Sequence, residues 1–179
     1  MQIVERREKT VVIDGIVDSD VRSRNFAGKE KKDQFGKIVN SEGRRNFLLM
    51  LPEDIAEELK DRGCEVKYSK VTQPNDVAKP YVSVNVSYYL KPVEAYMISN
   101  GITTPLDEAH VHMLDGVDFG NLCLELDFGK VKVHPKNNVE YVPIFAQKVW
   151  AEIVPNYIAS KYGAMMPGAV NTNDLPFQA

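Results

Sequence analysis

Polar and hydrophobic residues alternate along much of this chain, and an alternation with period two predicts β-strands. Residues 81–90 show it most clearly, because three valines and Tyr88 face one way while Tyr81, Tyr89 and small polar residues face the other. Further apolar or alternating runs predict strands at residues 9–21, 46–51, 64–71, 93–99, 117–133 and 139–155.

The clearest helical pattern lies at residues 52–63. Pro52 suits the first turn, two acidic residues follow it at the positive end of the helix dipole, and Gly63 is a natural C-cap. A turn and then a second short helix are predicted within residues 100–116. Gly15, inside the first strand, predicts a kink or bulge there.

These elements predict a mainly β protein with one or two short helices. Helices do not alternate with strands, so a doubly wound parallel sheet is disfavoured. We predict an OB-fold-like small barrel of about five to seven antiparallel strands, in which residues 93–99 pair with residues 81–90. Residues 1–163 would form this single domain. Residues 164–179, poor in charge and rich in proline, asparagine and small side chains, would form a flexible tail.

The net charge of -3 hides a segregation of charge along the chain. Residues 24–47 contain seven Lys or Arg and three Asp or Glu, a net charge of +4, and the remainder carries -7. The same segment begins and ends with the tripeptide Arg-Asn-Phe. A polyanion responds to the local field rather than to the total charge, so this basic loop is a candidate site for a nucleic acid.

Binding a single strand without sequence preference requires cations along the backbone and aromatic rings that stack on bases. The basic loop offers both, and the two Arg-Asn-Phe copies would end the two strands that hold it. The alternative is a solvated loop whose phenylalanines pack inward, as Phe47 would if it opens a buried strand. The candidate nucleic-acid-binding residues are the cations Arg24, Lys29, Lys31, Lys32, Lys37, Arg44 and Arg45 and the rings Phe26, Phe35, Tyr81 and Tyr89.

Potential metal ligands cluster around His110 and His112, among several acidic residues. His110 and His112 are two positions apart, and residues at that spacing on a helix do not face one another. A capped surface helix therefore explains the cluster better than a metal site does. The sequence lacks nucleotide-binding glycine motifs and a nucleophile elbow, and we expect no cofactor. Cys64 and Cys123 lie in separate apolar segments, which predicts buried free thiols in a reducing compartment.

The amino terminus is charged and lacks the apolar stretch of a signal peptide. No apolar run approaches the ~18 residues that a membrane span needs. These features predict a cytoplasmic protein with no membrane partner.

Several motifs, in their order along the chain, resemble the single-stranded DNA-binding proteins of bacteriophages and prophages, which have an oligonucleotide-binding-type fold. "RNFAGKE" is followed by "N-x-x-G-x-R-N-F", by the helix "EDIAEELKDRG" and by "VKYSK". The strand "PYVSVNVSYY" comes next. The segment "LDEAHVHMLDGVDFGNLCLEL" then matches the family pattern "L-x-x-x-x-V-x-x-L-D-x-x-D". The resemblance extends over residues 20–153.

The resemblance implies a non-catalytic protein that coats single-stranded DNA during phage DNA replication or recombination, in an infected or lysogenic bacterium. The tail is similar to the acidic Pro-Phe tip through which bacterial single-stranded DNA-binding proteins recruit partners, which here would be replication or recombination proteins. It departs from that pattern in having one acidic residue and two residues after the phenylalanine. The candidate partner-binding residues are Asp174, Leu175, Pro176 and Phe177.

Two rival functions remain open. One is a metal-dependent nuclease or phosphodiesterase that uses His110, His112 and the acidic residues nearby. The other is a phage adaptor that binds a host protein through its tail or its acidic face. Backbone charge and stacking serve DNA and RNA alike, so the sequence does not separate the two. It allows a homo-oligomer without fixing the oligomeric state.

Overall fold

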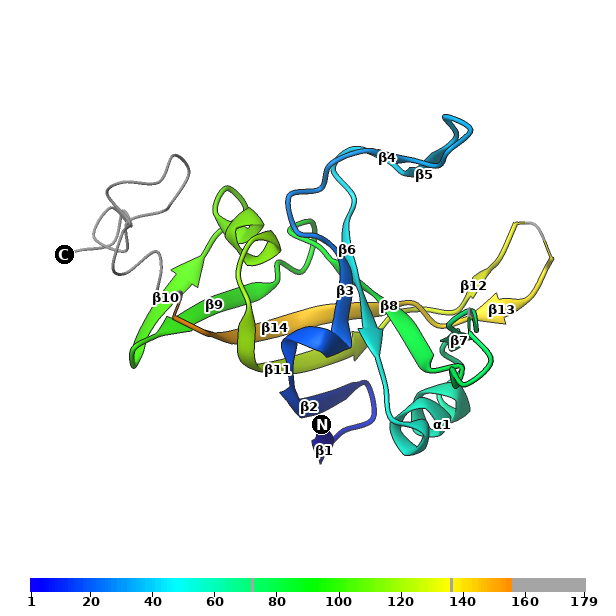
Figure 1. Cartoon of the computed structure of the whole chain (residues 1–179), viewed down its shortest axis with the longest axis horizontal. Helices are drawn as coiled ribbons and strands as arrows, with labels where there is room; N and C mark the ends of the chain where they lie inside the picture. The colour runs from blue at the N-terminus through cyan, green and yellow to red at the C-terminus, as the bar shows by residue number, and fades with distance from the viewer. Residues whose placement is uncertain (72, 136, 156–179) are drawn as a thin grey trace.

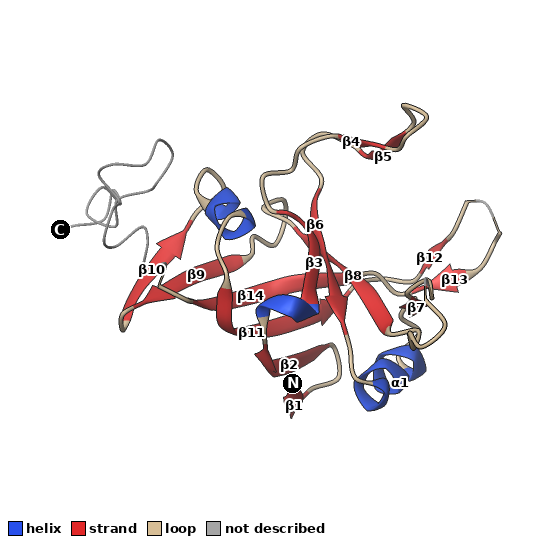
Figure 2. Ribbon diagram, in the orientation of Figure 1, coloured by secondary structure: helices blue, strands red, loops and turns tan. Residues whose placement is uncertain are grey.

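The computed structural model describes residues 1–155 except residues 72 and 136. The chain is mainly β (Figures 1 and 2), as the alternating pattern predicts. The helical elements of the described residues are α1 (Glu53–Asp61) and two 3-10 turns, η1 (Asp18–Asp20) and η2 (Val111–Asp115). The strands are β1 (Gln2–Arg6), β2 (Thr10–Ile16), β3 (Val21–Asn25), β4 (Lys31–Lys32), β5 (Ile38–Asn40), β6 (Arg45–Met50), β7 (Lys67–Tyr68), β8 (Pro80–Val86), β9 (Glu94–Ser99), β10 (Ile102–Leu106), β11 (Phe119–Phe128), β12 (Lys132–Val133), β13 (Glu140–Tyr141) and β14 (Ile144–Ile153).

The large sheet is open rather than closed into a barrel. Its main path runs β1-β2-β11-β14-β8-β6-β3, and in the described residues the end strands β1 and β3 do not pair with each other. The hairpins β4–β5 and β12–β13 are separate two-stranded sheets (Figure 1). The predicted OB-fold-like small barrel is therefore wrong in its closure. The mainly β content and the short α-helix at α1 are confirmed.

Strand β14 pairs in parallel with two strands that follow each other along the chain. Val84 of β8 lies beside Ile144, and Ala95 of β9 lies beside Val149. Strands β8 and β9 thus run one after the other along the same side of β14, joined by the loop 87–93. The predicted antiparallel pairing of these two segments is wrong, because β9 takes β10 as its antiparallel neighbour.

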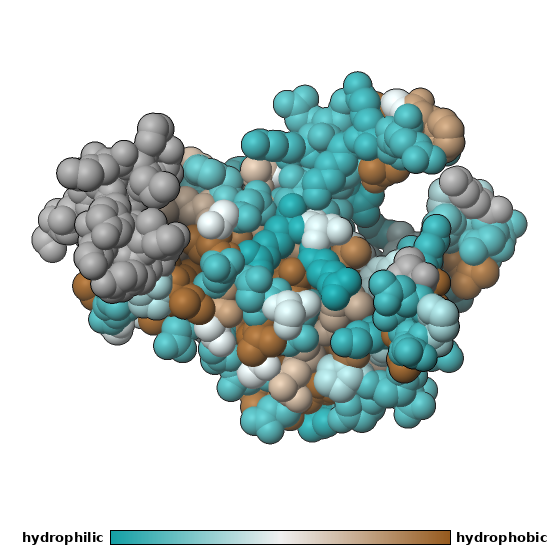
Figure 3. All heavy atoms as spheres, viewed as in Figure 1, coloured by the Kyte–Doolittle hydropathy of each residue, from teal (hydrophilic) through white to brown (hydrophobic). Residues whose placement is uncertain are grey.

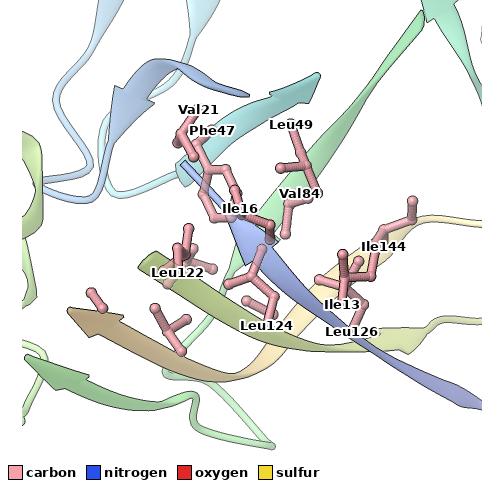
Figure 4. Packing of buried hydrophobic residues seen from close by; sticks show 14 of the residues in the cluster. Ile13, Ile16, Val21, Phe47, Leu49, Val84, Leu122, Leu124, Leu126 and Ile144 are labelled. Carbon is pink, nitrogen blue, oxygen red and sulfur yellow. The ribbon is translucent and has the colours of Figure 1, made fainter. Parts of the chain in front are cut away.

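Apolar side chains from β2, β6, β8 and β11 meet in one core between the strands. Figure 4 shows Ile13, Phe47, Val84, Leu124 and Leu126 in this cluster, and each is 0% exposed. Burying one such side chain fully contributes roughly 1.5–3 kcal/mol. The same alternation that predicts the strands therefore also identifies which of their faces is buried.

Two local sequence signals are confirmed. Gly15 has φ +74°, and the register between β2 and β11 shifts between Leu122 and Leu124, opposite this glycine. A Cβ at Gly15 would come within 3.2 Å of the backbone nitrogen of Met1. At the start of α1, Pro52 occupies the N-cap in an extended conformation, so the proline sets where the helix begins.

Both cysteines are free thiols, as predicted. Cys64 is buried and Cys123 is half-buried. Burial raises the pKa of the Cys64 thiol to about 12, against the opposing effect of the Arg62 guanidinium. Cys64 is therefore a protonated core side chain at neutral pH.

Candidate nucleic-acid interface

Residues 28–44, which we call the arm, extend from the sheet and contain the β4–β5 hairpin (Figures 1 and 3). Strands β3 and β6 carry the arm. They pair antiparallel, with Asn25 opposite Asn46, so the two Arg-Asn-Phe copies lie side by side at its base. This confirms the prediction that the repeated tripeptide ends the two supporting strands. At the tip, the backbone N–H groups of Phe35 and Lys37 donate to Oδ1 of Asp33 at 2.9 and 3.0 Å and close the turn.

Three asparagine side chains hold the base of the arm together. Asn25 and Asn40 are only 2% and 5% exposed, and buried amides require hydrogen-bond partners. Nδ2 of Asn25 donates to the carbonyl oxygen of Lys29 at 2.9 Å, and Nδ2 of Asn40 donates to that of Arg44 at 2.9 Å. Nδ2 of Asn46 then donates to Oδ1 of Asn40 at 3.0 Å. Asn25 and Asn40 thus bond the backbone where the two strands diverge into the arm, and Asn46 holds the side chain of Asn40 in place.

Asp115, the last residue of η2, fastens the start of the arm to the body. Its two carboxylate oxygens accept the backbone N–H groups of Phe26 and Ala27, each at 2.8 Å. Val111 and Leu114 anchor η2 in the core, at 1% and 0% exposure. Charge-assisted hydrogen bonds of this kind are about twice as strong as neutral ones. The placement of the arm therefore depends on a residue far from it in the sequence.

Most of the predicted cations lie along the arm and reach solvent. Lys31 is an exception, because its Nζ donates to the carbonyl oxygens of Ser23 and Arg24 at 3.2 Å and braces the base. Nζ of Lys32 lies 3.1 Å from Oε1 of Glu30, an exposed ion pair of small energetic weight. The exposed cations of the arm are Lys29, Lys32, Lys37 and Arg44.

Arg24 and Arg45, one in each tripeptide copy, make contacts within the protein. Arg24 pairs with Asp18, and its Cζ lies 4.0 Å from the centroid of the Phe119 ring. Arg45 pairs with Glu108 at 3.0 Å. Their side chains are 13% and 17% exposed. Either guanidinium group would have to leave these partners to reach a phosphate.

The four predicted stacking rings lie in different environments. Phe26 is fully buried and stacks on Phe47, with 5.3 Å between the ring centroids. Phe35, at the arm tip, is 84% exposed, and Tyr89, in the loop after β8, is 79% exposed. Tyr81 is half-buried on β8. Inward packing thus applies to Phe26 and Phe47, which leaves Phe35 and Tyr89 as the rings most open to a base.

Asp18 links β3, which supports the arm, to β11, and it makes the stability of the fold depend on pH. Partial burial acts to raise the pKa of Asp18, but the backbone N–H of Phe119 and the Arg24 guanidinium outweigh it and lower the pKa. A carboxyl group with a lowered folded-state pKa stabilises the fold above its unfolded pKa and loses this effect as pH falls through the folded value. We expect Asp18→Asn to reduce the difference in urea midpoint between neutral and acidic solution. An unchanged difference would contradict this role.

The histidines of the nuclease alternative point to local partners. Nδ1 of His110 lies 2.6 Å from Oδ1 of Asp107, and Nδ1 of His112 lies 2.7 Å from the carbonyl oxygen of Ala109. Among the residues that the structure describes, no three His, Cys, Asp or Glu side chains are grouped so as to hold a metal ion. Residues 100–116 contain strand β10 and then the 3-10 helix η2, so the predicted short helical element is present, but it is not an α-helix and a strand precedes it.

Sequence reasoning missed the residues that position the arm. Asn25 and Asn46 stand inside the repeated tripeptide, and their central place in a duplicated motif was the available signal. Asp115 belongs to the cluster of potential metal ligands and to the family pattern, and neither predicts that its carboxylate holds the start of the arm. Asn40 is the first residue of the motif "N-x-x-G-x-R-N-F", but that motif does not indicate that its side chain bonds the carbonyl oxygen of Arg44. The predicted tail residues 174–177 lie outside the described residues.

The fold and the arm together define a β-sheet protein that presents a basic hairpin with an exposed aromatic tip. The family model described as "Putative phage ssDNA-binding domain" matches residues 1–145. The chain belongs to this family, as its motifs indicate. Within the described part of the chain, no helix combines the length and apolar character that crossing a membrane requires.

Two solved structures are similar to this chain. The single-stranded DNA-binding protein from bacteriophage Enc34 in complex with ssDNA has a TM-score of 0.47 at 11% identity, covering 86% of this chain and 96% of that one. A second structure, described as the single-stranded DNA-binding protein from bacteriophage Enc34, matches with a TM-score of 0.46 at 10% identity, covering 96% of each chain. No curated protein matches the sequence significantly.

Proposed function

We propose that this chain binds single-stranded DNA without catalysing a reaction, and coats it during phage DNA replication or recombination. The observation that carries the proposal is the arm, which extends exposed cations and a phenylalanine away from an otherwise acidic chain that belongs to a phage ssDNA-binding family. Cations beside an exposed ring are what binding of a single strand without sequence preference requires.

In the proposed mechanism the arm lies across the strand. Phosphates contact the exposed cations Lys29, Lys32, Lys37 and Arg44, which releases condensed counterions and makes affinity fall with salt. A base stacks on Phe35, with Tyr89 as the second ring and the less exposed Tyr81 as a third. The remaining predicted residues Arg24, Lys31 and Arg45 set the position of the arm, and Phe26 belongs to its core support.

The division of the chain into a domain at residues 1–163 and a tail at residues 164–179 is part of the proposal. Residues 164–179 would form a tail separate from the domain, and the segment 174–177 would place a Leu-Pro-Phe anchor in a pocket of a replication or recombination protein. A peptide that joins one acidic residue to an apolar anchor suits a partner with a basic rim around an apolar pocket.

Fluorescence anisotropy with labelled oligo-dT, its duplex and the same strand as RNA tests the proposed function. We expect tight binding to the single DNA strand, much weaker binding to the duplex and a steep loss of affinity with salt. Intact probe after incubation with Mg²⁺ or Mn²⁺ is expected as well. Equal affinity for duplex, preference for RNA, or cleavage of the probe would each contradict the proposal.

Replacing Phe35 by serine should weaken single-strand binding by roughly tenfold, because one base–ring stack contributes on the order of 1–3 kcal/mol. The ring is 84% exposed, so unfolding should hardly change. Phe35→Tyr is the matched control, since it keeps an aromatic face. Equal losses in the serine and tyrosine variants would argue against stacking.

A further inference from the structure

The face of the large sheet that points away from the core carries large apolar side chains. Val12 of β2, Cys123 of β11 and Trp150 of β14 alternate with core residues along their strands, and each is half-buried. Tyr96 of β9 stacks on Trp150, with 6.4 Å between the ring centroids. We call these four side chains and Ile98 of β9 the outer face. A sheet face opposite the core is commonly polar, so apolar and aromatic side chains gathered there indicate an interaction surface.

The outer face is hollowed and negatively charged. A hollow of about 420 Å³ opens on it, and three carboxylates help to line this hollow: Glu5, Glu125 and Glu152. Arg7 pairs with Glu5 at 2.7 Å and lies 3.8 Å from Glu125, but Glu152 has no ion pair within the described residues. Burial raises the pKa of the Cys123 thiol, and nearby carboxylates add to this effect. The hollow therefore suits an occupant that joins cations to an apolar group.

The arm has these complementary features. Phe35, Ile38 and Val39 are 84%, 50% and 58% exposed, and the exposed cations of the arm lie around them. A two-stranded hairpin is only marginally stable in water by itself, so covering its apolar side chains would stabilise β4–β5. Figure 1 shows this hairpin at the opposite end of the molecule from β1 and β2. An arm that fills the hollow therefore belongs to a second copy of the chain.

We propose that the arm of one copy docks on the outer face of a second copy when no DNA is bound. Phe35 enters the hollow beside Trp150, and the arm cations face the carboxylates that line it. Because the contact joins two different surfaces, it can extend from copy to copy.

Carboxylates and stacked rings offer the arm what the phosphates and bases of a single strand offer it. The outer face and DNA therefore compete for the same arm, and binding of DNA releases the second copy. This competition rests on the proposed function, whereas the contact between two copies does not.

Sedimentation velocity and quenching by acrylamide test the contact, because Trp150 is the sole tryptophan of the chain. Both are measured across about 1–100 µM protein, where a contact with a micromolar dissociation constant is partly formed. We expect the sedimentation coefficient to rise and the quenching of Trp150 to fall with protein concentration, and salt to weaken both changes. An excess of oligo-dT of about 8 nucleotides, within the site sizes of single-strand-binding domains, should restore the quenching seen in dilute protein.

Two charge-reversed variants separate the two sides of the contact. Glu5→Lys/Glu152→Lys changes two exposed side chains, so that cations outnumber carboxylates in the lining of the hollow. Lys29→Glu/Lys37→Glu/Arg44→Glu makes the arm acidic. In either variant the arm and the outer face carry the same sign, so self-association should weaken on the order of tenfold or more. An equimolar mixture should associate again, because the basic arm of the first variant meets the acidic outer face of the second.

The matched control is Glu57→Lys/Asp61→Lys, which makes the same change of charge at exposed positions of α1 and should associate as the wild type does. A mixture that stays dissociated would overturn the contact, and so would an equal loss of association in the control. Quenching of Trp150 that is low in dilute protein and independent of concentration would also overturn it, by assigning the outer face to another segment of the same chain.

The DNA titration separates this inference from the proposed function. Binding of oligo-dT without any change in the quenching of Trp150 or in sedimentation would overturn the competition. Failure of the wild type to bind oligo-dT would overturn the proposed function instead, and the variants would still decide whether the arm docks on the outer face.

Discussion

Reversing three arm charges, in the variant Lys29→Glu/Lys37→Glu/Arg44→Glu, should reduce affinity for single-stranded DNA on the order of 100-fold or more. Each of the three side chains is exposed, and the described residues provide no ion-pair partner for any of them. Their loss therefore removes phosphate contacts without breaking an internal bond. Surface changes of this kind alter the free energy of unfolding by no more than about 0.5 kcal/mol. Anisotropy titrations and urea unfolding measure the two effects separately.

A charge-preserving variant, Lys29→Arg/Lys37→Arg/Arg44→Lys, is the matched control and should bind within a few-fold of the wild type. A neutral triple to glutamine should lower the salt slope by about 2, because three phosphate contacts to a single strand are lost. Wild-type affinity in the glutamate triple would remove the arm from the interface, even if the protein binds DNA elsewhere.

Asp115→Ala should destabilise the protein by about 3 kcal/mol, because two backbone N–H groups lose a charged acceptor in a partly buried place. The bonds from Phe26 and Ala27 are both 2.8 Å long. Asp115→Asn keeps one acceptor oxygen and should cost roughly half as much. Urea unfolding measures these differences. Asp118→Ala, an exposed acidic residue three positions on, is the control and should change stability by less than about 0.5 kcal/mol.

Single-strand binding should also weaken in Asp115→Ala, because the arm loses its fastening to η2. This loss should exceed that of Asp118→Ala, although both variants remove one negative charge and so favour DNA equally through net charge. Full stability in Asp115→Ala would show that the arm's first turn is held by the asparagine cluster alone.

Local patterns predicted those parts of the fold that depend on neighbouring residues. The helix α1 follows from Pro52, the acidic first turn and one apolar face, all within a few residues of one another. The bulge at Gly15 and the buried faces of β2, β8 and β11 follow from period two and from the freedom of glycine. The repeated Arg-Asn-Phe correctly indicated the paired strands below the arm.

Long-range pairing was beyond local patterns. Strand β14 pairs in parallel with β8 and β9. The local pattern within these strands does not indicate which distant strand each one pairs with. The same limit explains the site. Phe26 and Phe35 both lie in the polar, glycine-containing segment 24–47, but Phe26 lies where β3 meets the core and stacks on Phe47, whereas Phe35 lies at a hairpin tip. Whether a ring is exposed or fills the core depends on its tertiary position, which the local sequence does not give.

The most direct test of the central claim maps where a single strand touches the protein. An oligo-dT in which 5-iodo-deoxyuridine replaces some thymidines is bound to the wild-type chain, irradiated and digested, and the crosslinked peptides are identified by mass spectrometry. The account predicts crosslinking at the arm peptide that contains Phe35. Crosslinks confined to the stacked pair Tyr96 and Trp150, whose ring centroids lie 6.4 Å apart on other strands, would contradict it.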